Sequence, residues 1–300
     1  MLDLSKLETE RRNPETMELD AFTPLQIAQA MNREDQRAVD AVHAVLSQVA
    51  TAIEWATQSL RDGGRIVYTG AGTSGRLGVL DAVECPPTFG VSPDVVVGLI
   101  AGGEGAFVRA AEGAEDDSDA GRRDLEGIEL RSHDLVVGLA ASGRTPYVVG
   151  ALAYARKLGC RTVAIACTPE SEIGHAAELA IEPITGPEVL TGSTRLKAGT
   201  AQKLILNMVS TGAMTGVGKV YQNLMVDVMQ TNEKLHVRAR DIVVSACGCS
   251  GEVAQDALDA AGGNVKVAIT MLLLSCSADE ARAALAAADG HVRGALAGAR

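Results

Sequence analysis

The sequence predicts an α/β protein of three layers, in which helices cover both faces of a parallel β-sheet. Between residues 61 and 245, short apolar segments of strand length alternate with helical segments. Such alternation is typical of parallel sheets that are buried on both faces. A helical region precedes this part of the chain, and short helices follow it. We therefore expect an N-terminal helical segment (1–60), a central α/β domain (61–245) and a small C-terminal module of three helices (246–300).

The N-terminal region and the strands can be read in order. Apolar residues recur near helical spacing from Pro24 to Leu60, and Asp62-Gly63-Gly64 is suited to end that helical region. Helices are expected after the first strand, through Val83, and after the third, from Pro146 to Leu158. The expected strands are Arg65–Thr69, Asp94–Ile100, Asp134–Leu139, Arg161–Ala166 and Leu179–Ile184.

The last third of the chain is predicted to be helical. Ala198–Thr215 is apolar nearly all round, so this helix should be buried or packed on a partner subunit. Glycine-rich and serine-rich turns divide the remainder into short segments of helical character. These are Gly251–Ala260, Val265–Leu274 and Ala278–Ala288.

Charge and cysteine usage exclude several classes of partner. The net charge is −11, which disfavours a nucleic-acid surface because phosphate-backbone binding needs clustered Lys and Arg. The six cysteines form no Cys-x-x-Cys pair, and Cys247-Gly-Cys249 has no histidine at ligand spacing, so we expect buried thiols without disulfides or metal. The N-terminus lacks the apolar core of a signal peptide, and no apolar stretch is long enough to span a bilayer. These features predict a cytoplasmic protein.

Two loops have the composition of a phosphate site. Gly70-Ala-Gly-Thr-Ser-Gly75 and Ala141-Ser-Gly-Arg-Thr145 each follow a predicted strand and precede a predicted helix. Ligands of parallel sheets bind outside the carboxyl ends of the strands, where helix N-termini offer N–H donors to anions. The first loop lacks the Lys of a nucleotide-binding P-loop. It contains G-x-G-x-x-G, but no acidic residue follows the second strand to hold a ribose. Glycine turns that serve only packing remain the alternative.

Several ordered motifs carry a resemblance that covers the chain from about Leu7 to its final helices. The motifs are Thr9-Glu-Arg-Arg-Asn13, Gly70-Ala-Gly-Thr-Ser-Gly-Arg-Leu-Gly78, Glu84-Cys-Pro-Pro-Thr-Phe-Gly90, Ser142-Gly-Arg-Thr-Pro146, Gly186-Pro-Glu-Val189 and Gly192-Ser-Thr-Arg-Leu-Lys-Ala-Gly-Thr200. In these segments the chain resembles the N-acetylmuramic acid 6-phosphate etherases, whose central fold is a sugar-isomerase domain, and its C-terminal module resembles ubiquitin-associated three-helix folds.

The resemblance implies a lyase reaction in amino-sugar catabolism and cell-wall recycling. The family removes the D-lactyl ether from C3 of N-acetylmuramic acid 6-phosphate, leaving N-acetylglucosamine 6-phosphate and D-lactate. The aldehyde of the open-chain sugar makes the C2 proton acidic, lactate leaves from C3, and water then adds to the unsaturated intermediate. The resemblance implies no metal and no organic cofactor, and a homodimer as the assembly.

The resemblance also implies roles for particular residues. The two catalytic acids correspond to Glu84 and Glu115. Glu84 precedes Cys85-Pro86-Pro87, and apolar neighbours such as Leu80 and Val83 would suit it as the proton donor. Residues implied to contact the substrate or its phosphate are Gly72, Thr73, Ser74, Ser142, Gly143, Arg144, Thr145, Glu188 and Lys197.

Other interpretations remain open at this point. Arg144 equally fits a solvent-exposed role, Glu188 and Lys197 an interface salt bridge, and Arg76 is a candidate to orient the bound sugar. Without the motifs, Glu84 and Glu115 would read as a helix terminus and a solvated helix start. A non-catalytic sugar-phosphate regulator would use the same phosphate loops without needing both glutamates. A phosphosugar isomerase would also move protons, but the Glu84–Phe89 and Ser193–Lys197 segments favour the etherase.

Overall fold

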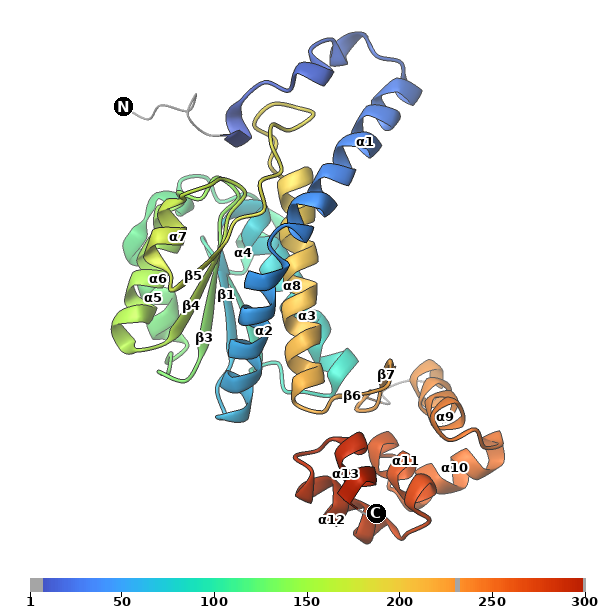
Figure 1. Ribbon diagram of the computed structural model, residues 1–300. Helices are drawn as coiled ribbons and strands as arrows, with labels where there is room; N and C mark the ends of the chain where they lie inside the picture. The colour runs from blue at the N-terminus through green and yellow to red at the C-terminus, as the bar shows by residue number, and fades with distance from the viewer. Residues whose placement is uncertain (1–7, 230–232, 299–300) are drawn as a thin grey trace. The chain divides into compact units, whose positions relative to one another are not determined.

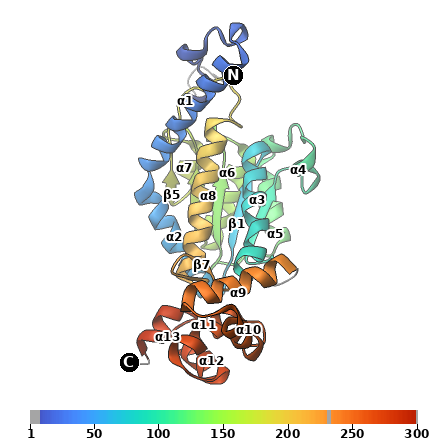
Figure 2. The same cartoon turned by 90° about the vertical axis from the view of Figure 1, so that its right-hand side faces the viewer.

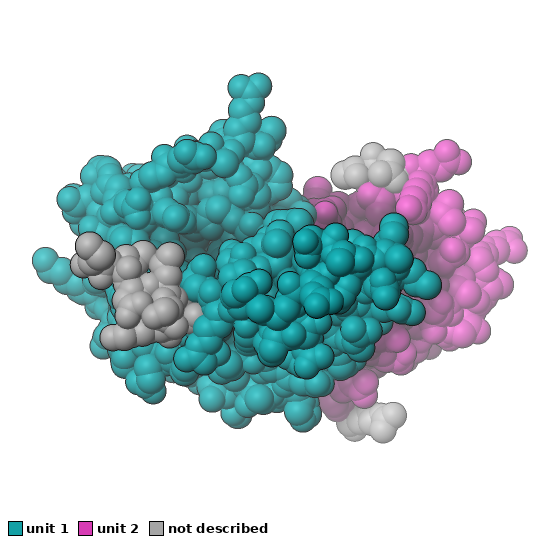
Figure 3. Space-filling model, turned by 90° about the horizontal axis from the view of Figure 1, so that it is seen from above, with its two compact units in different colours: residues 1–83, 94–210 teal, residues 84–93, 211–300 magenta. Residues whose placement is uncertain are grey.

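The computed structural model describes residues 8–229 and 233–298. The chain divides into two compact units, Met1–Val83 with Asp94–Ser210, and Glu84–Pro93 with Thr211–Arg300 (Figure 3). These units are defined by contacts within the chain, whereas the boundaries expected from the sequence follow changes of pattern. The segment 61–245 accordingly contributes residues to both units.

The first unit is built on a five-stranded parallel sheet, as the sequence predicts (Figure 1). The strands lie in the order β2-β1-β3-β4-β5, so the chain moves outward to β2 and then returns past β1 to β3. The strand bounds are β1 (Ile66–Gly70), β2 (Val96–Ile100), β3 (Leu135–Leu139), β4 (Arg161–Ile165) and β5 (Leu179–Ile181).

Helices cover both faces of this sheet (Figures 1 and 2). On one face lie α5 (Ser118–Gly127), α6 (Pro146–Leu158) and α7 (Glu172–Ala176). On the other lie α2 (Leu46–Arg61), α3 (Gly72–Phe89) and α8 (Lys197–Gly216). Every residue of β1 and β3 is buried, which explains why these strands are continuously apolar rather than alternating. The bounds of α6 match the sequence-based expectation.

Val, Leu and Ala side chains form the core between the sheet and α5, α6 and α7. Val67 and Val136 from the sheet pack there with Tyr147 and Leu152 from α6, and all four are at most 1% exposed. Fully burying one such aliphatic side chain stabilises the fold by roughly 1.5–3 kcal/mol. The layer architecture therefore rests on these apolar positions.

An ion cluster closes the amino ends of two neighbouring strands. Asp134, at the start of β3, accepts hydrogen bonds from the backbone N and the guanidinium of Arg65 and from the backbone N of Arg131. The shortest of these joins Arg65 Nη2 to Asp134 Oδ2 at 2.7 Å. Because the Asp134 side chain is fully buried, its charge depends on these partners.

The N-terminal helices precede the sheet. α1 (Pro24–His43) begins at a capping box between Thr23 and Gln26, and α2 ends at Arg61, followed by Gly63 at φ +74°. The expected helical region and its stop are therefore confirmed, with a break after His43. Short 3-10 turns at Glu8–Glu10, Pro14–Thr16 and Leu19–Ala21 come before α1.

The second unit contains a short hairpin and a helical cluster. The hairpin strands are β6 (Val220–Tyr221) and β7 (Leu224–Met225). The three expected helices are present as α10 (Gly251–Ala260), α11 (Val265–Leu274) and α12 (Ala278–Ala287), and each begins at a capping side chain: Ser250, Asn264 and Ser277. Two helices that the sequence analysis did not anticipate join their apolar core, α9 (Glu233–Cys247) and α13 (Val292–Gly298).

One expectation about α3 was wrong. This helix was expected to run through Val83, but α3 continues to Phe89 with Pro86 and Pro87 inside it. The rings fit a helical φ, and the helix loses only the two N–H groups that would pair with the Ala82 and Val83 carbonyls. It stops where the N–H of Gly90, at φ +62°, bonds to the carbonyl of Pro86.

No single helix among residues 8–229 and 233–298 has both the length and the apolar composition needed to cross a membrane. The pair α10 and α11 meets those two criteria only when taken together, and it is bent by 112°.

Candidate active site

The phosphate-loop candidates meet at the carboxyl edge of the sheet. Gly70, the last residue of β1, is directly opposite Leu139, the last residue of β3. The chain leaves β1 into α3 on one face of the sheet and leaves β3 into α6 on the other. This divergence is the switch point at which open parallel sheets bind ligands.

A buried glutamine of α8 makes a hydrogen bond to the first loop, Gly70–Gly75. Ser74 is 7% exposed, and its Oγ donates to Oε1 of Gln202 on α8 at 2.8 Å. The Gln202 amide in turn donates to the carbonyl of Ile165 at 3.4 Å. Because the Ser74 proton is used, its oxygen can offer a ligand only lone pairs in this arrangement. Gly72 and Thr73 lie beside it at the start of α3.

The second loop depends on Gly143. Its φ of +73° and a neighbouring Ser171 Cβ, 2.4 Å from where a Gly143 Cβ would be, leave no room for a side chain. The Gly143 N–H bonds to the Ala140 carbonyl, and its own carbonyl accepts from Ile173, so the loop is tied to α7. Ser142 is half-buried beside this turn.

The same loop ends at the N-terminus of α6. Thr145 occupies the N-cap position, its side chain makes no capping hydrogen bond, and Pro146 fills the first helical position. The end of α6 is thus open to an anion. Arg144 Nε donates to Glu172 at 2.8 Å, in a surface ion pair whose side chains are 35% and 58% exposed.

Glu188 and Lys197 lie away from solvent, within protein contacts. The Glu188 carboxylate accepts from the backbone N–H groups of Lys197 and Ala198, both at 3.0 Å, at the start of α8. Burial raises the pKa of the Glu188 carboxyl, although these two donors oppose the shift. The Lys197 ammonium donates to Glu34 of α1, which also accepts from Asn13 at 2.8 Å. These contacts favour a role in tying the N-terminal segment to the loop before α8.

Glu115 lines a cavity next to the first loop. It lies in the 3-10 turn Ala114–Asp116, and its side chain is exposed. Arg76, one turn into α3, lines the same cavity, whose volume is about 260 Å³. The structure therefore brings Glu115 together with the first loop. The residues around the cavity are Ala71, Gly72, Arg76, Ala101, Ala106, Ala110, Ala111, Glu112, Gly113 and Glu115.

Glu84 belongs to the second compact unit and is exposed on α3. Its expected apolar neighbours are themselves solvent-facing, since Leu80 is 45% and Val83 57% exposed. Within a single chain the apolar enclosure expected for Glu84 is therefore absent among the described residues.

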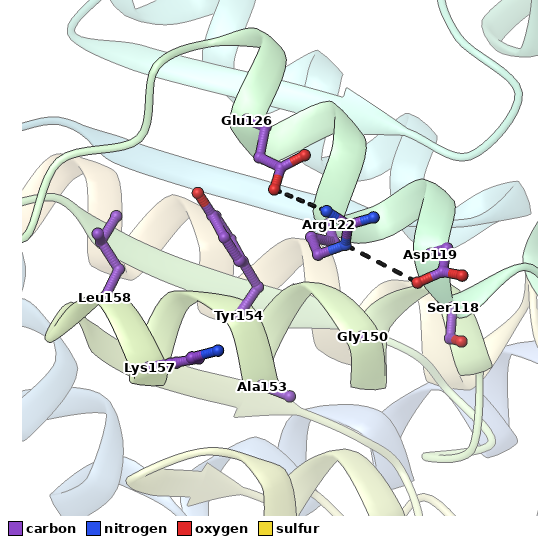
Figure 4. Close-up of a pocket in the computed structure, with 9 residues that line it drawn as sticks. All are labelled: Ser118, Asp119, Arg122, Glu126, Gly150, Ala153, Tyr154, Lys157 and Leu158. Carbon is purple, nitrogen blue, oxygen red and sulfur yellow. Dashed lines mark hydrogen bonds and ion pairs between the residues drawn. The ribbon is translucent and has the colours of Figure 1, made fainter.

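A larger cavity of about 520 Å³ lies between α5 and α6 (Figure 4). Arg122 points between Asp119 and Glu126, while Tyr154 and Lys157 project from α6. This cavity is lined by helix side chains and includes neither glycine-rich loop, so it is not the candidate site.

Gln202 and Glu34 were missed by the sequence analysis. The sequence held a signal for Gln202, because it is a polar residue in the apolar run Ala198–Thr215. A polar side chain that is fully buried in such a helix has to be hydrogen-bonded. Glu34 gave none, because its partner Lys197 is 163 residues away in the chain.

Comparisons with known proteins agree with this fold. Residues 48–156 match the glucokinase regulatory protein N-terminal SIS domain family, and residues 125–211 match the SIS domain family. Phosphoheptose isomerases from Neisseria gonorrhoeae and Francisella tularensis superpose with TM-scores of 0.50 each, at 17% and 14% identity. They cover 64% and 65% of this chain, with all of each isomerase aligned. The part of the chain from residue 48 to residue 211 accordingly has the fold of a SIS domain.

Closer relatives define the family. The chain is 58% identical over 272 residues to an N-acetylmuramic acid 6-phosphate etherase from Pectobacterium atrosepticum, covering 91% of this chain and 90% of the relative. A Yersinia pestis protein of the same name is 59% identical, covering 91% and 92%. The chain belongs to the N-acetylmuramic acid 6-phosphate etherase family, and the resemblance seen in its motifs is confirmed.

Proposed function

We propose that this protein is a lyase that converts N-acetylmuramic acid 6-phosphate into N-acetylglucosamine 6-phosphate and D-lactate. The proposal is carried by the switch point of the sheet, where the two phosphate-type loops follow the paired ends of β1 and β3 and the first loop lines the cavity of Glu115, in a chain of this family. The regulator and isomerase alternatives are not favoured, because relatives at 58–59% identity are etherases.

The phosphate would bind between the two loops. Ser142 and Thr145 would contact it together with the free end of α6, with Gly143 forming the tight turn that presents them, and Ser74 would accept from a hydroxyl or a monoprotonated phosphate. Thr73 and the N–H group of Gly72 would complete the first-loop side. Arg144, at the edge of the site, would offset part of the negative charge of the phosphate. Glu188 and Lys197 would hold the loop before α8 in place.

The chemistry proceeds by elimination followed by hydration. Ring opening gives a C1 aldehyde, so a carboxylate can remove the C2 proton. The electron pair of the broken C2–H bond then forms the C2=C3 double bond as the C3–O bond breaks. The departing lactate oxygen takes a proton from a carboxylic acid. Water then adds at C3 while C2 is reprotonated. We assign Glu84 as the proton donor and Glu115 as its acid–base partner.

We also propose a homodimer acting in the cytoplasm, in amino-sugar catabolism and peptidoglycan recycling. α3 and α8 pack together, as the Ser74–Gln202 hydrogen bond shows, and they leave Leu80, Val83 and Met208 exposed. A second copy covering these apolar side chains would remove water from around Glu84. Light scattering on the purified protein tests the assembly, and one chain mass at micromolar concentration would contradict it.

The activity has a direct test. The purified protein is incubated with N-acetylmuramic acid 6-phosphate, and D-lactate release is measured with unphosphorylated N-acetylmuramic acid as the control. We expect D-lactate to be released from the phosphorylated sugar and not from the unphosphorylated control. Aldose–ketose conversion without lactate would indicate an isomerase, and binding without turnover would indicate a regulator.

A further inference from the structure

Arg76 ties α3 to the segment that leads to Glu115. Its Nε donates to the Phe107 carbonyl at 2.8 Å, and its Nη2 donates to the Ala106 carbonyl at 2.7 Å. Both carbonyls belong to α4 (Gly105–Val108), a four-residue helix whose last carbonyls have no following turn to pair with. The guanidinium supplies the donors that this short helix lacks.

The turn at Gly102 packs closely against the same segment. Gly102 has φ +89°, and a Cβ built there would lie 2.6 Å from the Ala111 Cβ and 3.4 Å from the Ala114 Cβ. A side chain at position 102 would therefore displace the stretch that contains Glu115. Arg76 and Gly102 act on this segment at two separate points.

Little apolar burial holds the segment otherwise. Val108 is 82% exposed and Phe107 39% exposed, while Ala106 is buried but small. Segments with few buried apolar contacts open locally at low free-energy cost. The position of Glu115 should therefore depend strongly on the two hydrogen bonds from Arg76.

We propose that Arg76 is a positioning residue, which fixes the 104–115 segment against α3 so that the Glu115 carboxylate meets the sugar bound at the first loop. The inference rests on the proposed function for the role of Glu115. It differs from a direct sugar contact, because the two observed bonds of Arg76 go to protein carbonyls. Misplacing a catalytic group by about 1 Å can reduce turnover by ~10²-fold.

The experiment compares Arg76→Gln and Arg76→Lys with Arg122→Gln, a control arginine in exposed ion pairs on α5. We expect kcat for Arg76→Gln to fall by about tenfold to hundredfold with KM changed less than about threefold. Arg76→Lys should recover part of the loss, since an ammonium can still donate to a carbonyl. Gly102→Ala, which keeps Arg76, should lower kcat in the same way.

Amide hydrogen exchange of the unliganded protein gives a readout independent of activity. Exchange in Arg76→Gln should accelerate within residues 104–116 and remain unchanged in the sheet strands. A kcat within about twofold of the wild type, a raised KM with unchanged kcat, or unchanged exchange in this segment would each overturn the proposal. If the wild-type protein releases no lactate, the proposed function fails, whereas the exchange data still decide whether Arg76 holds the segment.

Discussion

The Ser74 hydroxyl donates to the Gln202 amide oxygen at 2.8 Å, and this contact joins the first glycine-rich loop to the buried face of α8. Gln202 is fully buried and also donates to the Ile165 carbonyl at the end of β4. The loop, the helix and the strand are therefore fixed by one amide group.

Replacement of that amide should affect binding and stability together. Gln202→Leu leaves the buried Ser74 hydroxyl without its acceptor and removes one of two donors to the Ile165 carbonyl, which keeps the Ala140 N–H. The loss should lower the free energy of unfolding by about 1–3 kcal/mol and raise KM roughly tenfold. Asn207→Leu, at an exposed position on the same helix, is the control. In a double-mutant cycle, Ser74→Ala and Gln202→Leu should be non-additive in KM. Additivity within about 0.5 kcal/mol would contradict the coupling.

Ser142→Ala should weaken binding of the sugar phosphate. The substitution removes one hydroxyl from an anion site that retains backbone donors, and a hydrogen bond to a charged group contributes roughly 1.5–3 kcal/mol. That corresponds to about a tenfold to hundredfold rise in Kd, measured by calorimetry. Ser245→Ala, on the exposed side of α9, should bind as the wild type does. Equal affinities of the Ser142 and Ser245 variants would place the phosphate elsewhere.

Asp134 should make the fold sensitive to acid. Burial pushes its pKa upward, but the hydrogen bonds from Arg65 and Arg131 outweigh burial and hold the pKa below its ordinary value. A carboxyl group whose pKa is depressed in the folded state stabilises the fold at pH values above its pKa in the unfolded chain, about 3.9. This contribution to stability is lost as the pH falls through the folded-state pKa.

Asp134→Asn tests this by unfolding in guanidinium chloride, followed by the fluorescence of Trp55, the single tryptophan of the sequence. At neutral pH the variant should lose about 3 kcal/mol of unfolding free energy, and its stability should fall less steeply below about pH 4 than that of the wild type. Asp279→Asn, in an ion pair whose Asp is 96% exposed, is the control. Parallel acid profiles of Asp134→Asn and wild type would rule out this role.

Glu84→Gln should leave the fold intact and reduce turnover by at least ~10²-fold, the usual range for loss of a general acid–base group. Glu54→Gln changes an exposed glutamate on α2 in the same way and should retain full turnover. Thermal midpoints of both variants should match the wild type. Near-normal lactate release by Glu84→Gln would remove Glu84 from the mechanism.

Local patterns predicted much of the fold and less of the site. The helix Pro146–Leu158 and the five strands follow from apolar periodicity and from the loops that bound them. The continuation of α3 through Pro86 could not be anticipated, because proline is disfavoured in helices yet tolerated where tertiary packing holds the turn. The contact between Lys197 and Glu34 depends on chain topology, which spacing does not encode. The same reason hides the Arg76 bonds to α4.

The proposed reaction cleaves the ether by elimination across C2 and C3. The most direct test runs the reaction in deuterated, ¹⁸O-labelled water and locates both isotopes in the products by NMR and mass spectrometry. Elimination and hydration predict deuterium at C2 and ¹⁸O at C3 of N-acetylglucosamine 6-phosphate, with the original ether oxygen kept in D-lactate. Retention of the C2 hydrogen together with ¹⁸O in the lactate would contradict elimination, and with it the roles of Glu84 and Glu115.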